Sequence, residues 1–167
     1  MSRIPLKIGV RKVVHPHLLF ERDSCYGNKV NPPFSIGNIP VEGKSIALIM
    51  ESSDQQGINR THWIAWNIPA TGLILENESR GDAGINDFGT QGYLGPSLIN
   101  FPNSCTFRFF VLDRFLSFPK PSMVSKFDLY AHIINYGLGH GKYEFQNLPL
   151  KKLSAPLDTH RKALELK

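Results

Sequence analysis

Three absences narrow what this sequence can encode. No run of residues approaches the roughly 18 uninterrupted apolar residues that a membrane-spanning helix needs, so no transmembrane segment is expected. Only two of the 167 residues are cysteines, Cys25 and Cys105, which is too few for a disulfide framework. Gly-x-Ser-x-Gly, His-Glu-x-x-His, Walker and dinucleotide-binding fingerprints are all missing. We therefore expect a protein that is not an enzyme and that uses neither a metal nor another cofactor.

The N-terminal stretch is basic and only partly apolar. Residues 1–20 lack the compact apolar segment, followed by small residues, that marks a cleaved signal peptide. A cytoplasmic location is the expectation that follows, and in that compartment thiols stay reduced. Each of the two cysteines is then predicted to be a small buried apolar residue.

The positive charge lies mainly at the two ends of the chain. The formal net charge is +5 and the pI is near 9.3. The terminal basic residues are Arg3, Lys7, Arg11, Lys12, Lys151, Lys152, Arg161, Lys162 and Lys167. No basic run interleaves with aromatic residues that would stack on bases, so nucleic acid is not the expected partner. A length of 167 residues predicts a single domain, with residues 1–22 and 150–167 as peripheral basic termini.

Hydrophobic patterning predicts strands in the middle of the chain. The three clearest segments are residues 44–51, 62–67 and 106–113. The first is a continuous apolar run that ends in a carboxylate, which is typical of a strand buried on both faces. In the second, alternation places His62 on the same face as Ile64 and Trp66. Clusters of proline, glycine and asparagine separate these segments and predict turns.

Helical periodicity is found only toward the C-terminus. Residues 122–136 carry apolar residues at three- and four-residue steps, and Gly137 is a natural stop. The apolar positions are Met123, Phe127, Tyr130, Ile133 and Ile134. A short second helix is predicted over residues 159–166, with Asp158 as its N-cap. Strands first and helices last indicate a mostly β fold, an antiparallel β-sandwich of the Greek-key type with a few peripheral and C-terminal helices.

The most informative feature of the chain is the loop over residues 87–96, DFGTQGYLGP. Its three glycines within seven residues disfavour both helix and strand. A loop of this kind exposes backbone N–H groups, which bind an anion when the fold holds them in place. His62, on a strand upstream of the loop, is a complementary side chain for such an anion.

This loop and the His62-Trp63 strand resemble the anion-pocket signature of the phosphatidylethanolamine-binding protein family, whose bacterial members are often labelled Raf-kinase-inhibitor-like. The family's Asp-Phe-Gly-x-x-Gly-Tyr-x-Gly-Pro pattern is matched at every fixed position. The resemblance extends from about Gly27 to Tyr143 and implies the same β-sandwich fold.

Two departures make the chain a divergent member by this resemblance. The family carries Asp-Pro-Asp-Ala-Pro eleven residues before the pocket histidine, and counting back from His62 puts Glu51 at the first acid. Both prolines of that motif are absent here. Further on, Asn103 stands where the family has a second pocket histidine. Losing that donor removes a charge-assisted hydrogen bond, so weaker or altered phosphate binding is expected.

The resemblance implies where a ligand would bind and of which kind. The predicted ligand-binding residues are Glu51, His62, Gly92, Tyr93, Gly95, Pro96 and Asn103. The implied ligand is a small anion or zwitterion, such as phosphate or a phosphoethanolamine-like head group. A second interpretation is a regulatory, inhibitor-like module whose pocket rim docks a partner protein such as a kinase or a protease. A homodimer is compatible with the resemblance, although no surface for one is indicated.

The residues by themselves leave structural alternatives open. Taken alone, His62 is explained as a satisfied, half-buried strand residue, and Glu51 is equally explained as a surface residue at a strand end. The convergence of these two side chains at one end of the sandwich is therefore a prediction that the tertiary structure has to test.

Overall fold

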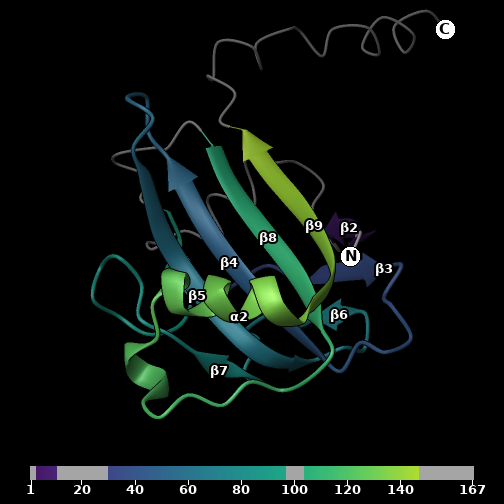
Figure 1. Cartoon of the computed structure of the whole chain (residues 1–167). Helices are drawn as coiled ribbons and strands as arrows, with labels where there is room; N and C mark the ends of the chain where they lie inside the picture. Colours follow the sequence, from purple (N-terminus) through teal and green to yellow (C-terminus); the bar gives the residue numbers. More distant parts are fainter. Residues whose placement is uncertain (1–2, 11–29, 97–103, 147–167) are drawn as a thin grey trace, which may run out of the picture.

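The computed structural model of the chain describes residues 3–10, 30–96 and 104–146 (Figure 1). In chain order its elements are β1 (Ile4–Pro5), β2 (Lys7–Val10), β3 (Phe34–Gly37), β4 (Ser45–Ser53), β5 (Asn59–Pro69), β6 (Leu73–Ile74), β7 (Asp82–Ala83), β8 (Ser104–Leu112), the 3₁₀ helix η1 (Pro121–Met123), α2 (Lys126–Tyr136) and β9 (Gly137–Gln146). The three strands predicted from hydrophobic patterning correspond to β4, β5 and β8.

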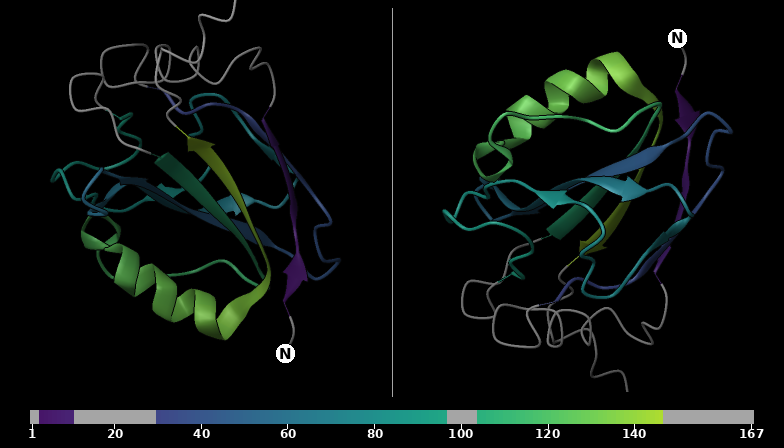
Figure 2. Two further views of the ribbon diagram at one scale, coloured as in Figure 1. Left: turned by 90° about the horizontal axis from the view of Figure 1, so that it is seen from above. Right: turned by 90° about the horizontal axis from the view of Figure 1, so that it is seen from below.

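The strands form two sheets, and α2 lies outside them. The larger sheet has six strands in the order β1-β9-β8-β4-β5-β7, and the smaller has three in the order β2-β3-β6. The strand pairs are antiparallel except for β1 with β9. The small sheet and α2 cover opposite faces of the large sheet (Figure 2). The predicted mostly β sandwich with a peripheral helix is confirmed, whereas the helix predicted over residues 159–166 lies outside the described residues.

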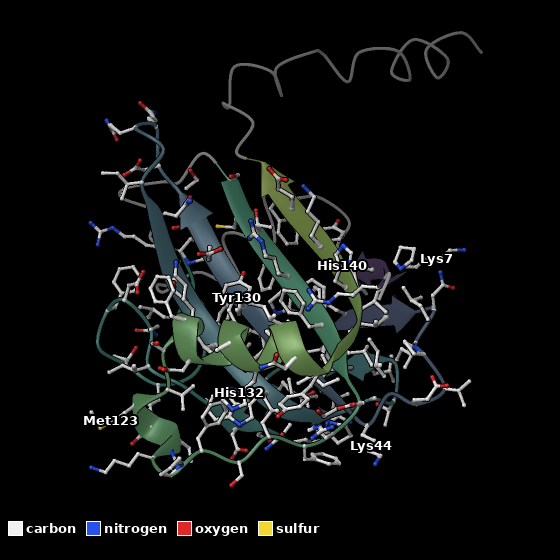
Figure 3. All side chains as sticks on the ribbon, viewed as in Figure 1. Lys7, Lys44, Met123, Tyr130, His132 and His140 are labelled. Carbon is white, nitrogen blue, oxygen red and sulfur yellow. The ribbon has the colours of Figure 1, made fainter. Side chains whose placement is uncertain are left out.

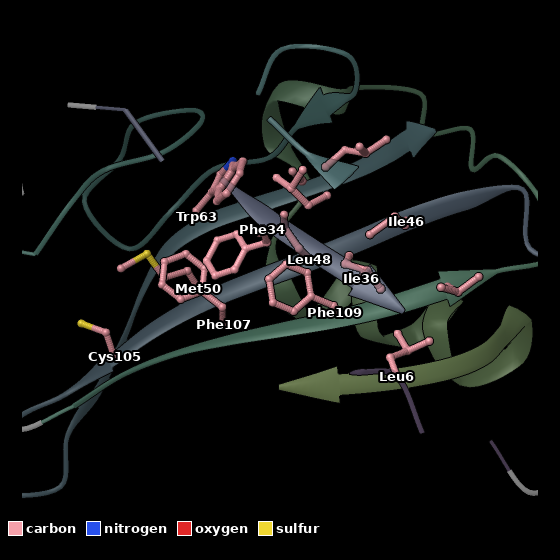
Figure 4. Close-up of a cluster of buried hydrophobic side chains, with 14 of the residues drawn as sticks. Leu6, Phe34, Ile36, Ile46, Leu48, Met50, Trp63, Cys105, Phe107 and Phe109 are labelled. Atoms are coloured by element: carbon pink, nitrogen blue, oxygen red, sulfur yellow. The ribbon is translucent and has the colours of Figure 1, made fainter. Parts of the chain in front are cut away.

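Strand β4 runs through the middle of the large sheet and is buried on both faces, as its continuous apolar run predicts. The even-numbered residues from Ile46 to Met50 face the small sheet and join the cluster that contains Phe34 (Figure 4). Ala47 and Ile49 face the other way and pack in the cluster beneath α2. Covering both faces explains why this strand shows no polar alternation.

Cys105 on β8 belongs to the cluster between the two sheets. It is 1% exposed and is a free cysteine. Burial raises the pKa of its thiol to about 12, so the side chain stays protonated and behaves as a small apolar residue. This confirms the prediction for Cys105, while Cys25 lies outside the described residues.

Helix α2 begins later than its sequence pattern predicts. Ser125 caps the helix, because its backbone N–H donates to the Asp128 carboxylate at 2.8 Å and the Asp128 N–H donates back to the Ser125 hydroxyl oxygen. This reciprocal capping box sets the first turn. The residues upstream form the separate turn η1, which starts at Pro121.

The predicted apolar stripe of this helix faces the core only in part. Leu129 and Ile133 are buried against the large sheet. Met123 on η1 (Figure 3) is instead 66% exposed, and Phe127 and Ile134 on α2 are more exposed still. Met123 is exposed because it lies on the separate turn η1, and Phe127 and Ile134 are exposed because they lie on a different side of α2 from the buried Leu129 and Ile133. Within the described ranges, no helix is both long and apolar enough to cross a membrane.

Candidate functional site

His62 is placed by a local irregularity in the pairing of β4 with β5. Met50 pairs with Trp63 and Glu51 pairs with Thr61, which leaves His62 as an extra residue without a partner across the ladder. A bulge of this kind re-aims a side chain that strict alternation would send elsewhere. Regular alternation predicted His62 on the sheet face that carries Ile64. The bulge instead turns its ring toward the opposite face of the sheet, where Ser52 lies.

Both nitrogens of the His62 ring have a hydrogen-bond partner. Nδ1 lies 2.8 Å from the Leu94 carbonyl oxygen, and Nε2 lies 2.8 Å from the Ser52 hydroxyl oxygen. A carbonyl only accepts, so the hydrogen of the neutral ring is on Nδ1. Nε2 then accepts a hydrogen bond from Ser52. The histidine is thus held in one tautomer between a strand residue and the glycine-rich loop.

The surroundings of His62 favour its neutral form. The side chain is 4% exposed, and burial is the largest influence, which lowers its pKa from the usual value. The backbone groups of Leu94 and Gly95 and the charge of Asp87 act in the opposite direction, while Arg60 lowers the pKa a little further. The net effect is a pKa below the ordinary range of histidine.

This shift makes a prediction about stability and pH. Because the folded-state pKa of His62 lies below the unfolded value near 6.5, the unfolded chain binds the proton more readily. The contribution of His62 to the free energy of unfolding is therefore fully present above pH 6.5 and is lost as the pH falls through the folded-state pKa. We expect wild type to lose more stability between pH 7.5 and 5 than His62→Gln, measured by urea denaturation at each pH. Parallel pH profiles for the two proteins would contradict this.

Asn86 organises the loop that reaches His62. Its amide Nδ2 donates to the His62 carbonyl oxygen at 3.2 Å and to the Thr90 hydroxyl at 2.8 Å. Its Oδ1 accepts from the backbone N–H groups of Phe88 at 3.0 Å and Thr90 at 3.1 Å. The side chain is 4% exposed, so these are buried hydrogen bonds that hold the loop in a fixed conformation.

Asp87 joins this loop to the end of β5. Its backbone N–H donates to the Thr61 carbonyl oxygen at 3.0 Å, and its carboxylate accepts from the Thr61 N–H at 2.7 Å.

Neither Asn86 nor Ser52 was predicted from the sequence. An asparagine directly before a Gly-rich loop is a known turn signal and would have pointed to Asn86. Ser52 had no such signal.

The structure locates the predicted residues of the loop individually. Gly92 has a φ of +81°, and a Cβ placed there would meet no atom within 4 Å, so its conformation rather than crowding requires glycine. Tyr93 packs against Trp63, with ring centroids 5.5 Å apart. Gly95 and Pro96 are buried, and the Gly95 backbone lies beside the His62 ring. Asn103 lies outside the described residues.

Glu51 does not join His62, contrary to the prediction that the two converge. Its carboxylate accepts from Lys126 Nζ at 2.7 Å and from the Arg108 guanidinium at 3.1 Å, beneath α2. Successive residues of a strand point to opposite faces, so Ser52 faces the side on which the His62 ring lies and Glu51 faces away from it. The residue beside the histidine is therefore Ser52, one position later than the sequence count placed the acid.

A family model identifies the chain. The model for phosphatidylethanolamine-binding protein matches residues 10–142, which include both His62 and the loop beside it. The chain belongs to the phosphatidylethanolamine-binding protein family. This confirms the family that the loop motif indicated.

Relatives of this family member are found in archaea and bacteria. A UPF0098 protein of Methanothermobacter thermautotrophicus is 35% identical over 130 residues, which cover 72% of this chain and 84% of the relative. One from Chlamydia muridarum is 33% identical over 135 residues, covering 72% and 87% of the two chains. A UPF0098 protein of Archaeoglobus fulgidus is 32% identical over 130 residues, and there the match spans only 45% of the relative's length.

Solved structures of the family share the fold. A phosphatidylethanolamine-binding protein homologue of Chlamydia trachomatis superimposes with a TM-score of 0.69 at 22% identity, covering 84% of this chain and 95% of the other. YbcL of Escherichia coli, a member of the same family, gives a TM-score of 0.65 at 19% identity and covers 83% and 95%. At these identities the likeness establishes the fold alone.

Proposed function

We propose that this family member is a non-catalytic binding protein that holds a small anion, such as phosphate or a phosphorylated head group, beside His62. The observation that carries the proposal is the position of the His62 ring, held between Ser52 and the Leu94 carbonyl next to Gly95. The loop that supplies Leu94 and Gly95 matches the family's anion-pocket pattern at every fixed position. The name of the family, phosphatidylethanolamine-binding protein, supports a ligand of this class.

Proton uptake by His62 would prepare the site for an anion. While the His62 ring is neutral, the Ser52 hydroxyl donates its hydrogen to Nε2. When Nε2 takes up a proton, that bond reverses, and the Ser52 hydroxyl hydrogen becomes available to a ligand. The site then carries a positive charge and a hydroxyl hydrogen that is no longer bonded to the ring, and both favour an anion. Binding is therefore coupled to protonation, so affinity rises as the pH falls toward the pKa of His62, which burial holds below its usual value.

Calorimetric titration of phosphate and phosphoethanolamine at pH 6.0 and 7.5 tests the proposal. Wild type should bind more tightly at pH 6.0, and His62→Ala should lose about tenfold or more in affinity, since a charge-assisted hydrogen bond is removed. His140→Ala is the matched control, because His140 is an exposed histidine on β9. No heat from folded wild type at either pH would mean that the site does not bind these anions.

One observation favours a second candidate, the docking of a partner protein at the rim of this site. Phe88 is 44% exposed although its ring centroid is only 4.8 Å from that of His62. Exposed aromatic residues are over-represented where proteins bind one another. A partner that is retained by His62→Ala but released by Phe88→Ala would support docking, whereas dependence on His62 alone would support the anion site.

A further inference from the structure

A cavity lies beside β5, on the sheet face that carries Trp63. It has a volume of about 230 Å³. Its walls include Asn31, Trp63, Glu78, Asp82, Ala83 and Tyr93, and His62 does not line it. The cavity is therefore a separate space from the histidine site, although both adjoin the same loop. Its size suits a molecule of only a few heavy atoms.

Two aromatic rings form one wall of this cavity. Trp63 and Tyr93 meet edge to face, with ring centroids 5.5 Å apart and planes at 87°. Trp63 is 3% exposed, so its ring is largely removed from water. The faces of tryptophan and tyrosine rings attract cations, and this attraction strengthens when the site is shielded from solvent.

Most of the polar groups around the cavity already form hydrogen bonds within the protein. The Glu78 carboxylate accepts from the Arg80 guanidinium at 2.6 Å and from the Leu75 N–H at 2.9 Å, so this acid and base offset each other. The Asn31 amide donates to the Leu75 carbonyl oxygen at 2.7 Å and accepts from the Glu78 N–H at 2.8 Å. These groups build the wall and leave no net charge in it.

Asp82 is the exception. One carboxylate oxygen accepts from the Asn67 amide at 2.7 Å, and no donor from the described residues bonds to the other. Asp82 is an exposed lining residue and gives the cavity a net negative charge beside the two rings. A carboxylate beside aromatic rings is the combination that recognises a substituted ammonium group.

We propose that this cavity binds a small organic cation, an alkylammonium compound whose charged head lies against Trp63 and Tyr93 and beside Asp82. The site is independent of the anion site proposed at His62. It adds a ligand of opposite charge to what the protein is proposed to hold.

Choline and its neutral isostere 3,3-dimethylbutan-1-ol are the probes that test this. The chain has two tryptophans, and Trp66 packs in the cluster beneath α2, so a ligand-induced change in fluorescence reports on Trp63. We expect saturable quenching by choline and an affinity about fivefold or more weaker for the isostere, since only the charge differs. Equal binding of the two compounds would overturn the proposal, and so would the absence of any saturable change with choline.

Three variants locate the site. Asp82→Asn should weaken choline about threefold while leaving the isostere unchanged. Ala83→Leu should abolish binding of both by filling the cavity. His62→Ala should leave choline binding unaltered, which separates this site from the anion site. Loss of choline binding in His62→Ala, or full retention in Ala83→Leu, would place the ligand elsewhere and refute the assignment.

Discussion

Phe34→Ala is expected to lower the free energy of unfolding by about 4 kcal/mol. The ring is 0% exposed and lies between the two sheets. Its centroid is 4.8 Å from that of Phe107 and 4.9 Å from that of Phe109 (Figure 4). Because β3 is the central strand of the small sheet, this one side chain connects that sheet to β8. Truncation would leave a cavity where the two sheets meet.

Urea denaturation followed by circular dichroism measures the effect. Phe115→Ala is the matched control, because Phe115 is 57% exposed and its truncation should change stability by about 0.5 kcal/mol or less. Phe34→Leu should fall between the two, since leucine fills part of the space. A loss below about 1.5 kcal/mol for Phe34→Ala would mean that the sheets close over the vacated volume.

Asn86→Ala is expected to destabilise the protein by about 3 kcal/mol, from the loss of several buried hydrogen bonds. The substitution removes the hydrogen-bond acceptor of two backbone N–H groups, those of Phe88 and Thr90, which donate to Asn86 Oδ1. It also removes the donor to the His62 carbonyl oxygen. The loop would then lose its fixed relation to the histidine, so phosphate affinity should fall although no proposed ligand contact has been altered.

Hydrogen exchange of the Phe88 and Thr90 amides separates the local effect from the global one. Both amides should exchange much faster in Asn86→Ala, by more than the loss of global stability explains. Asn135→Ala is the control, because its amide makes only an exposed bond to the Ala131 carbonyl oxygen within α2. Unchanged protection of both amides would show that the loop holds its shape without Asn86.

The two strongest patterns in the sequence were read correctly. The continuous apolar run predicted a strand buried on both faces, and β4 is that strand. The glycine-rich loop after residue 86 indicated the family that the family model confirms. Both patterns are local: an unbroken apolar run must be covered on every side, and positive φ at Gly89 and Gly92 favours glycine at these two positions of the loop.

The neighbours of His62 were not predictable in the same way. Which of two adjacent residues, Glu51 or Ser52, meets the histidine depends on the register between β4 and β5 and on the bulge opposite Met50. A shift of one residue sends a side chain to the other face of the sheet. The motif count came within one residue of the answer, but the difference replaces a carboxylate by a hydroxyl.

The sequence by itself indicated the mostly β fold, through short-range periodicity and turn chemistry, and the family, through the match of its glycine-rich loop and His62-Trp63 strand to the family's motif. Only the tertiary structure decided that Ser52 meets His62, that Glu51 binds Lys126 and Arg108, and that Asp82 lies at a cavity with Trp63 and Tyr93. The contacts of Glu51 with Lys126 and Arg108 join segments far apart in the chain, and the contact of Ser52 with His62 depends on the register of two neighbouring strands. Strand pairing, bulges and sheet packing set such contacts, and no local pattern of residues encodes them.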